Sequence, residues 1–142
     1  MPFIFFRMTT EKNKEVVIRF NQELIAAKNT TIVDELFAPD FINRTVRPGY
    51  PTGPDGVLQF LRENLWTGLS NITVEIHDQI AEGDKVTTRK TIHGILTGSF
   101  LGQPATNKKI GIFIIDIVRL KDGKYIEHWG IFDTQSVIAQ MA

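Results

Sequence analysis

Two runs of β-forming residues in the last third of the chain flank an Asp-Gly pair, and this pattern constrains the fold more than any other. The first run, 110–120, is mostly apolar, and the second covers 125–133. An Asp-Gly pair between such runs is typical of a two-residue β-hairpin, because both residues tolerate the positive φ angles of a type I′ turn. We therefore expect an antiparallel hairpin with Asp122 and Gly123 in its turn.

The two-residue turn also predicts the register of the hairpin. Pairing outward from the turn places Asp116 opposite Trp129 and Ile112 opposite Asp133. Because side chains alternate between the two faces of a strand, one face becomes an apolar wall with acids set into it. That face carries Ile112, Ile114, Asp116, Val118, Glu127, Trp129, Ile131 and Asp133. Burial raises the pKa of a carboxyl toward the range of a general acid or base, so Asp116 and Asp133 are candidates for chemistry.

Each of these two acids has an alternative explanation. Asp133 precedes a short predicted helix, 134–141, and its carboxylate is also suited to capping that helix. Asp116 is also interpretable as an interior carboxylate held by a backbone amide or an arginine. Four strand residues separate the two acids by about 13 Å, so we do not expect them to share a proton as in an aspartic protease.

The composition excludes several classes of protein. The 16 basic and 16 acidic residues cancel, so charge predicts binding neither to nucleic acid nor to a membrane surface. The chain has no cysteine, which excludes disulfides, thiol catalysis and cysteine-bound zinc, and its three histidines are widely spaced. We therefore expect no metal site. A length of 142 residues fits one domain, 1–142, with a core large enough to enclose a pocket.

The start of the chain is apolar but carries no recognisable targeting signal. Residues 1–7 are too few to span a membrane and lack the charged region and cleavage site of a signal peptide. We therefore expect a cytoplasmic protein. These residues are interpretable either as an extension ahead of the first helix, over 1–8, or as an added edge strand over 1–7.

Apolar residues at helical spacing predict three helices ahead of the strands. A stripe that includes Val17 and Phe20 marks the first helix, over about residues 11–27. A capping-box pattern at 31–34 begins a short second helix. The third begins at Pro54, because proline is favoured in the first turn of a helix.

The chain after Trp66 is predicted to be mainly strands. Alternating residues predict two strands joined by a turn at 82–84, and the loop 97–107 that follows is long enough to cover the mouth of a pocket. Helices followed by strands predict an α+β domain, with three helices packed on one face of a curved antiparallel sheet. Such a sheet encloses a cavity, and an apolar lining with a few polar groups is usual for a small-molecule site.

Three stretches of the sequence carry a family resemblance. The run 122–129 (DGKYIEHW), followed by Asp133 and Gln140, resembles the closing motif of the SnoaL-like polyketide cyclases, in the nuclear-transport-factor-two-like superfamily. The stretches 82–86 (EGDKV) and 97–106 (TGSFLGQPAT) also resemble sequences typical of that family. The resemblance covers most of the chain, from the first helix onward.

The resemblance implies a cone-shaped α+β barrel with a deep pocket, commonly a homodimer. It also implies chemistry without a cofactor on a small hydrophobic or polyketide-like molecule. In the cyclases an acid at the position of Asp133 is the general acid/base of an intramolecular aldol ring closure, so Asp133 is the implied catalytic residue. Desolvation against Trp129 and Ile131 is expected to raise the pKa of its carboxyl. Such proton transfer contributes about 10²–10⁴-fold in rate, so an oxyanion donor is also expected.

The expected pocket contains further residues around Asp133. They are Trp129, Asp116, Ile114, Ile131, Asn43 and His93. Relatives commonly have a histidine after the early extended segment, where this chain has Asn43 and Arg44, and either of these is expected to substitute as a hydrogen-bond donor. An inward-facing His93 could also donate to a substrate oxygen. His128 falls on the face opposite Asp133 in the predicted register, so we interpret it as a packing or surface residue.

The sequence also supports a rival function. Many relatives read Gly-Thr-His-Thr-Gly where this chain has Leu96 in place of the histidine. Leu96 and Asn43 favour a non-catalytic module that binds a hydrophobic ligand or dimerises, with Asp133 as a helix cap. An epoxide hydrolase or dehydratase of the same fold would need two acids close together, which the separation of Asp116 and Asp133 argues against.

Overall fold

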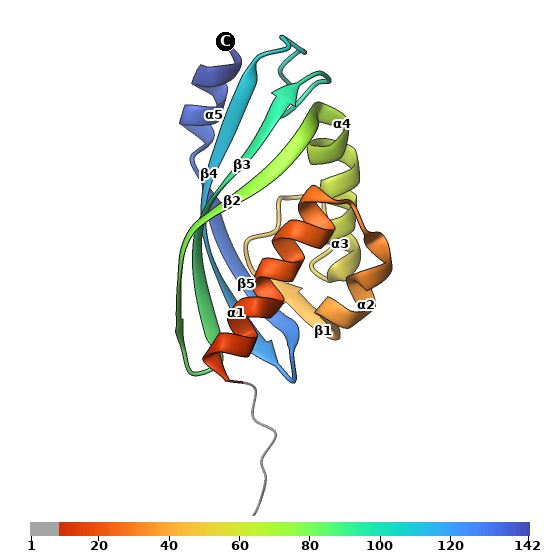
Figure 1. Cartoon of the computed structure of the whole chain (residues 1–142). Coiled ribbons are helices and arrows are strands. Elements are labelled where there is room, and N and C mark those ends of the chain that lie inside the picture. Colours follow the sequence, from red (N-terminus) through yellow and green to blue (C-terminus); the bar gives the residue numbers. More distant parts are fainter. Residues whose placement is uncertain (1–8) are drawn as a thin grey trace, which may run out of the picture.

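The first half of the chain is mainly helical and the second half is mainly strands (Figure 1). The computed structural model describes residues 9–142, so the expected extension over 1–8 lies outside the described residues. The helical segments are α1 (Thr10–Arg19) with its π-helical continuation η1 (Phe20–Ala26), η2 (Thr30–Ile32), α2 (Val33–Leu36), and the continuous α3 (Pro54–Phe60), η3 (Leu61–Leu65) and α4 (Trp66–Gly68). The strands are β1 (Phe37–Asn43), β2 (Leu69–Glu82), β3 (Lys85–Leu96), β4 (Lys109–Lys121) and β5 (Lys124–Phe132), and α5 (Thr134–Met141) follows them.

The strands form one curved five-stranded sheet in the order β1-β5-β4-β3-β2. Helices α1 to α4 lie along one side of this sheet in Figure 1. The predicted α+β fold, with helices packed on one face of a curved sheet, is confirmed. One detail differs: β1 pairs with β5 in parallel, whereas the other pairs are antiparallel, so the sheet is mixed.

The first helix is stabilised by a cap at its N-terminus and by a stripe of buried apolar side chains. Thr9 caps α1, since its side-chain oxygen accepts from the backbone N–H of Lys12 at 3.1 Å. Val17, Phe20 and Leu24 then recur at helical spacing and are all buried in the core. Full burial of side chains of this size contributes about 1.5–3 kcal/mol each, which fixes this helix on the sheet.

The predicted hairpin turn is confirmed, and the predicted register is wrong beyond it. Asp122 and Gly123 both have positive φ angles, of 52° and 75°, as a type I′ turn requires. The ladder then shifts by one residue, since Leu120 pairs with Tyr125 but Arg119 pairs with Glu127. Residue 126 is therefore the extra residue of a β-bulge, a feature that a count outward from the turn does not include.

This one-residue shift exchanges the faces of β5 beyond the bulge. Asp116 pairs with Gly130 rather than with Trp129. Because the side-chain period of a strand is two, His128 moves to the inner face beside Asp116. The residues expected on that wall, Trp129, Ile131 and Asp133, lie instead toward the outer face.

The C-terminal helix lies along the part of the β4 edge that β5 does not pair with. The backbone N–H of Asp133 still donates to the carbonyl of Phe113 at 3.0 Å, and the chain then turns into α5. The side-chain amide of Gln140 accepts from Gly111 N–H at 2.7 Å and donates to Gly111 C=O at 2.9 Å, as a neighbouring strand would. Gln140, a residue of the closing motif, therefore provides hydrogen bonds to backbone groups at the edge of β4.

Candidate functional site

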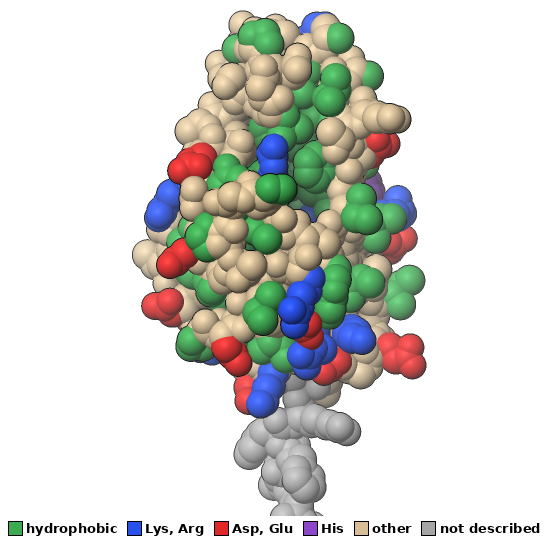
Figure 2. Space-filling view, turned by 180° about the vertical axis from the view of Figure 1, so that it is seen from behind, with side chains coloured by type: hydrophobic (Ala, Val, Ile, Leu, Met, Phe, Trp, Pro, Cys, Tyr) green, Lys and Arg blue, Asp and Glu red, His purple; other side chains and the backbone are tan. Residues whose placement is uncertain are grey.

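A cavity of about 200 Å³ lies between the helices and the inner face of the sheet. Its wall is mostly apolar, and Figure 2 shows its opening as a hollow lined with hydrophobic side chains. Polar side chains enter the lining from four places: β1 and the loop after it, β3, β4 and β5. They are Asn43, Thr45, Arg47, Tyr50, Lys90, Asp116, Tyr125 and His128. An apolar wall with a few convergent polar groups is the usual form of a small-molecule site.

A buried ion pair forms the centre of these polar groups. Lys90 Nζ lies 3.4 Å from Asp116 Oδ2, and the two side chains are only 3% and 5% exposed. Lys90 also donates to Asn21 Oδ1 at 2.6 Å, and its ammonium lies 5.5 Å from the centroid of the Phe20 ring. The lysine is thus held by an anion, an amide oxygen and an aromatic face, which together compensate the loss of water around its charge.

The surroundings of Asp116 keep it ionised despite its burial. Burial alone would raise the pKa of this carboxyl, but the charge of Lys90 and the hydrogen bond and charge of His128 outweigh that effect and hold the pKa below its usual range. The expected raised pKa of a carboxyl in this wall is therefore wrong for Asp116. The carboxylate can accept a proton, but it is a weak base.

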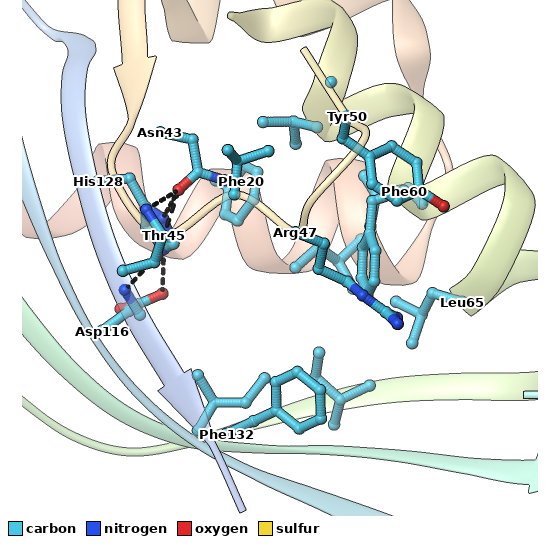
Figure 3. Close-up of a pocket in the computed structure, with 18 of the residues that line it drawn as sticks. Phe20, Asn43, Thr45, Arg47, Tyr50, Phe60, Leu65, Asp116, His128 and Phe132 are labelled. Carbon is cyan, nitrogen blue, oxygen red and sulfur yellow. Dashed lines mark hydrogen bonds and ion pairs between the residues drawn. The ribbon is translucent and has the colours of Figure 1, made fainter. Parts of the chain in front are cut away.

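His128 connects Asp116 to β1. Its Nε2 lies 3.4 Å from Asp116 Oδ2, and its Nδ1 lies 3.0 Å from Asn43 Oδ1 (Figure 3). Asn43 Oδ1 also accepts from the backbone N–H of Thr45 at 3.1 Å, which identifies this atom as the oxygen. His128 Nδ1 must then donate to it. Its Nε2 faces the carboxylate of Asp116, so both ring nitrogens have a partner in this polar cluster.

Two buried polar atoms of the cavity lining have no hydrogen-bond partner within residues 9–142. They are Asp116 Oδ1, an acceptor, and Tyr125 Oη, a donor. Burial raises the pKa of the Tyr125 phenol well above its usual value, and the negative charge of Asp116 raises it further, so the hydroxyl keeps its proton. Unpaired buried polar atoms are rare and unfavourable. A ligand oxygen or an acidic C–H group in the cavity would satisfy them.

Asp133 lies outside this cavity. It is exposed and forms the N-cap of α5, where its carboxylate accepts from Ser136 N–H at 3.0 Å. Asp133 and Trp129 line a second, open hollow of about 780 Å³, which includes residues of the outer face. Ile131 lines both this hollow and the inner cavity. The predicted burial of Asp133 against Trp129 and Ile131 is wrong, because the bulge turns this end of β5 over.

The remaining predicted site residues divide between the two sides of the sheet. Asn43, Ile114 and Asp116 line the inner cavity. His93 lies on the outer face, where its Nε2 is 2.9 Å from Glu75 Oε1, so it is not the inward-facing donor that we considered. Leu96 is fully buried in the hydrophobic core, where it contributes packing alone.

Sequence reasoning missed Lys90, His128 and Tyr125. Lys90 had a readable signal: residues 86, 88, 90 and 92 alternate with the exposed face of β3, so a lysine in that series faces the core. His128 and Tyr125 lie on opposite sides of the bulge, and no count along a regular strand places both on the inner face. Their positions follow only from the observed register.

The described part of the chain shows neither a metal-type cluster nor a membrane-spanning helix. Across residues 9–142, no three His, Asp or Glu side chains gather closely enough to coordinate a metal ion. The helices in that range are all too short or too polar to pass through a bilayer.

Solved structures of other proteins have the same fold. TsrD from Streptomyces laurentii has a TM-score of 0.85 at 21% identity, covering 96% of this chain and 98% of its own. IdmH, a candidate polyketide cyclase from Streptomyces antibioticus, has a TM-score of 0.79 at 25% identity, covering 90% and 96%. A candidate polyketide cyclase from Bacillus cereus has a TM-score of 0.78 at 29% identity, covering 92% and 80%.

The comparison by sequence is more specific about the family. No curated protein matches this chain significantly. The family model of the SnoaL-like polyketide cyclases, however, matches residues 15–141, which include every polar residue of the inner cavity. The chain therefore belongs to the SnoaL-like polyketide cyclase family.

Proposed function

We propose that this protein binds a small polyketide-like carbonyl compound in the inner cavity and that Asp116 is the catalytic base. The observation that carries the proposal is the unpartnered, buried Oδ1 of Asp116 in the cavity lining, which also includes the unpartnered Oη of Tyr125. The proposal replaces Asp133, the residue implied by the family resemblance, because Asp133 is exposed on the other side of the strand.

The proposed reaction begins with removal of a proton from carbon. Asp116 Oδ1 accepts the proton from a carbon next to a carbonyl, and the electron pair of the C–H bond moves onto the carbonyl oxygen. Tyr125 Oη donates a hydrogen bond to that oxygen. The enolate carbon then attacks a second carbonyl carbon of the same molecule, a C–C bond forms, and the new alkoxide takes the proton back from Asp116.

The low pKa of Asp116 limits which substrates can react. A weak base removes only a proton that is itself acidic, such as one on the carbon between two carbonyls. Proton transfer by a positioned group contributes about 10²–10⁴-fold, and one oxyanion donor contributes about 10²–10³-fold. Lys90 adds positive charge beside the anion that forms, so the site favours a β-dicarbonyl over a simple ketone.

Hydrogen–deuterium exchange at carbon tests the proposal directly. We expect the wild-type protein in heavy water to accelerate exchange at the central carbon of β-keto esters and aromatic polyketide mimics, as followed by NMR. Asp116→Asn should abolish this exchange, and Tyr125→Phe should lower it about 10²-fold through loss of the oxyanion donor. Tyr125→Phe removes only an unpaired hydroxyl, so the folded protein is expected to persist.

The matched control is Asp133→Asn, which retains a good helix-capping side chain. It should exchange at the wild-type rate if Asp116 is the base. Loss of exchange in Asp133→Asn with retention in Asp116→Asn would return the catalytic role to Asp133. Absence of exchange with every protein, while the same compounds still raise the melting temperature, would identify a hydrophobic-ligand binder instead of an enzyme.

The homodimer implied by the family resemblance is proposed to form through the outer face of the sheet. Four large apolar side chains are exposed there on β4 and β5: Phe113 by 49%, Ile115 by 56%, Ile117 by 37% and Ile131 by 78%. We call these four residues the outer apolar face. Monomeric proteins rarely expose a contiguous apolar patch of this kind. A second copy related by a two-fold axis presents the same patch and would bury it.

Replacing one of these side chains with a charge tests the dimer. Ile115→Lys is expected to weaken dimerisation about 30-fold or more, as for the loss of a central interface residue. Sedimentation velocity over a concentration series measures this change. Ile18→Lys, at an isoleucine that is 40% exposed on α1, introduces the same charge on the helical side and should leave the dimer intact. A wild-type protein that is monomeric at high concentration would contradict the proposal.

A further inference from the structure

The loop between β1 and α3 forms one wall of the cavity mouth, and it is fixed at several points. At its start the backbone N–H of Arg44 donates to the carbonyl of His128 at 2.8 Å, and at its end the carbonyl of Thr52 accepts from Asn43 N–H at 2.7 Å. In between, the Tyr50 ring packs edge-on against Phe60, with the ring centroids 6.3 Å apart. The loop therefore holds its side chains in defined positions.

Arg47 is the basic residue of this loop that faces the cavity. Its guanidinium carbon lies 6.0 Å from the centroid of the Phe60 ring, and the residue lines the same cavity as Asp116. Figure 3 shows Arg47 extending into the cavity on the side away from Asp116, His128 and Asn43. Of the carboxylates described in 9–142, none pairs with this guanidinium, whereas the neighbouring Arg44 pairs with Glu127 at 2.9 Å.

The charges of the lining leave the cavity with a positive excess. Lys90 and Asp116 neutralise one another. His128 contacts the same carboxylate. Arg47 then adds a positive charge that no acidic residue of the lining balances. Arg47 is itself exposed, so it would contact a ligand anion in a partly solvated setting at the edge of the apolar wall.

The geometry points to a carboxylate on the ligand, bound by Arg47 at the mouth of the cavity. The ligand is then an elongated apolar acid, with its carboxylate at Arg47 and its hydrocarbon or ring system along Phe60 and the apolar wall. A guanidinium is suited to this role because its planar set of donors matches the two oxygens of a carboxylate. Combined with the proposed function, on which this step rests, the substrate class becomes a β-dicarbonyl compound that is a free acid, with its reactive carbon at Asp116.

A binding measurement without chemistry tests the assignment. The probes are 2-naphthoate and its neutral counterpart 2-naphthamide, titrated at low salt by isothermal titration calorimetry. The wild-type protein should prefer the carboxylate. Arg47→Gln should weaken naphthoate binding about fivefold or more, the order expected for a partly solvated guanidinium–carboxylate contact. Its affinity for naphthamide should stay within about twofold of the wild-type value, since the apolar wall is unchanged.

Arg62→Gln is the matched control, because Arg62 lies exposed on η3 and does not line the cavity. It removes the same charge from the same half of the protein and should leave both affinities unchanged. Equal affinity of the wild-type protein for the acid and the amide would overturn the assignment, as would an equal loss for both probes in Arg47→Gln. If the wild-type protein prefers the acid but catalyses no hydrogen–deuterium exchange at carbon, the carboxylate site stands and only the proposed catalysis is wrong.

Discussion

Replacing Asp116 with leucine is expected to lower the free energy of unfolding by about 3–5 kcal/mol, because the change leaves the ammonium of Lys90 buried without its counter-ion. Lys90 is 3% exposed and would retain only the amide oxygen of Asn21 and the ring of Phe20 as partners. Urea unfolding followed by tryptophan fluorescence measures the difference. The protein is expected to fold but to unfold at a clearly lower urea concentration.

The double variant Lys90→Met/Asp116→Leu separates the loss of a charge pair from the loss of packing. Removing both charges together is expected to recover most of the stability, since apolar side chains of similar size often replace a buried ion pair without penalty. Asp78→Leu provides a surface control, because Asp78 and Arg89 form an exposed pair at 3.0 Å, worth about 1 kcal/mol or less. If Asp116→Leu were as stable as Asp78→Leu, the prediction that Lys90 needs Asp116 as its buried counter-ion would be wrong.

The same pair gives the protein a pH dependence with a definite sign. The pKa of Asp116 in the folded protein is lower than the usual value of an aspartate carboxyl. A carboxyl whose folded pKa is depressed contributes stability that is fully present above its unfolded pKa and is lost as the pH falls toward the folded pKa. The wild-type protein should therefore lose more stability below about pH 4 than the double variant, which lacks this carboxyl.

The turn of the β4–β5 hairpin was predictable and its register was not, for a physical reason. The Asp-Gly pair determines the backbone angles at 122 and 123, so local sequence is sufficient there. The bulge at 126 depends on how the whole strand packs between β1 and β4, and no residue in 125–128 identifies it in advance. One unpaired residue then decided whether His128 or Trp129 faces the cavity.

The two acids show the limit of local reasoning in different ways. The sequence left open whether Asp133 caps a helix, and the structure contains that capping bond. For Asp116 the sequence correctly predicted an acid in an apolar wall, but the partner came from β3, 26 positions earlier in the chain. A contact between distant positions requires the sheet order, which the spacing of apolar residues does not provide. The catalytic roles of both acids remain predictions.

Gly56→Ala is expected to destabilise the protein by about 3 kcal/mol, the upper end of the usual range for overpacking. A Cβ atom at Gly56 would lie 1.8 Å from the carbonyl oxygen of Pro51 and 2.8 Å from its carbonyl carbon. Both are backbone atoms of the loop that carries Arg47, so the clash can be relieved only by moving the loop or α3. Helix propensity alone predicts the opposite sign, a gain of about 1 kcal/mol for alanine.

The control for this change is Gly53→Ala, on the same loop. Its Cβ would meet only the carbonyl oxygen of Phe41 at 3.9 Å, an ordinary contact, so the loss should stay below about 1 kcal/mol, as for a weakened N-cap. If the loop fixes Arg47, Gly56→Ala should also weaken 2-naphthoate binding, whereas Gly53→Ala should not. Equal stability and equal binding of the two variants would mean that the loop yields freely, and a yielding loop could not hold a guanidinium at the cavity mouth.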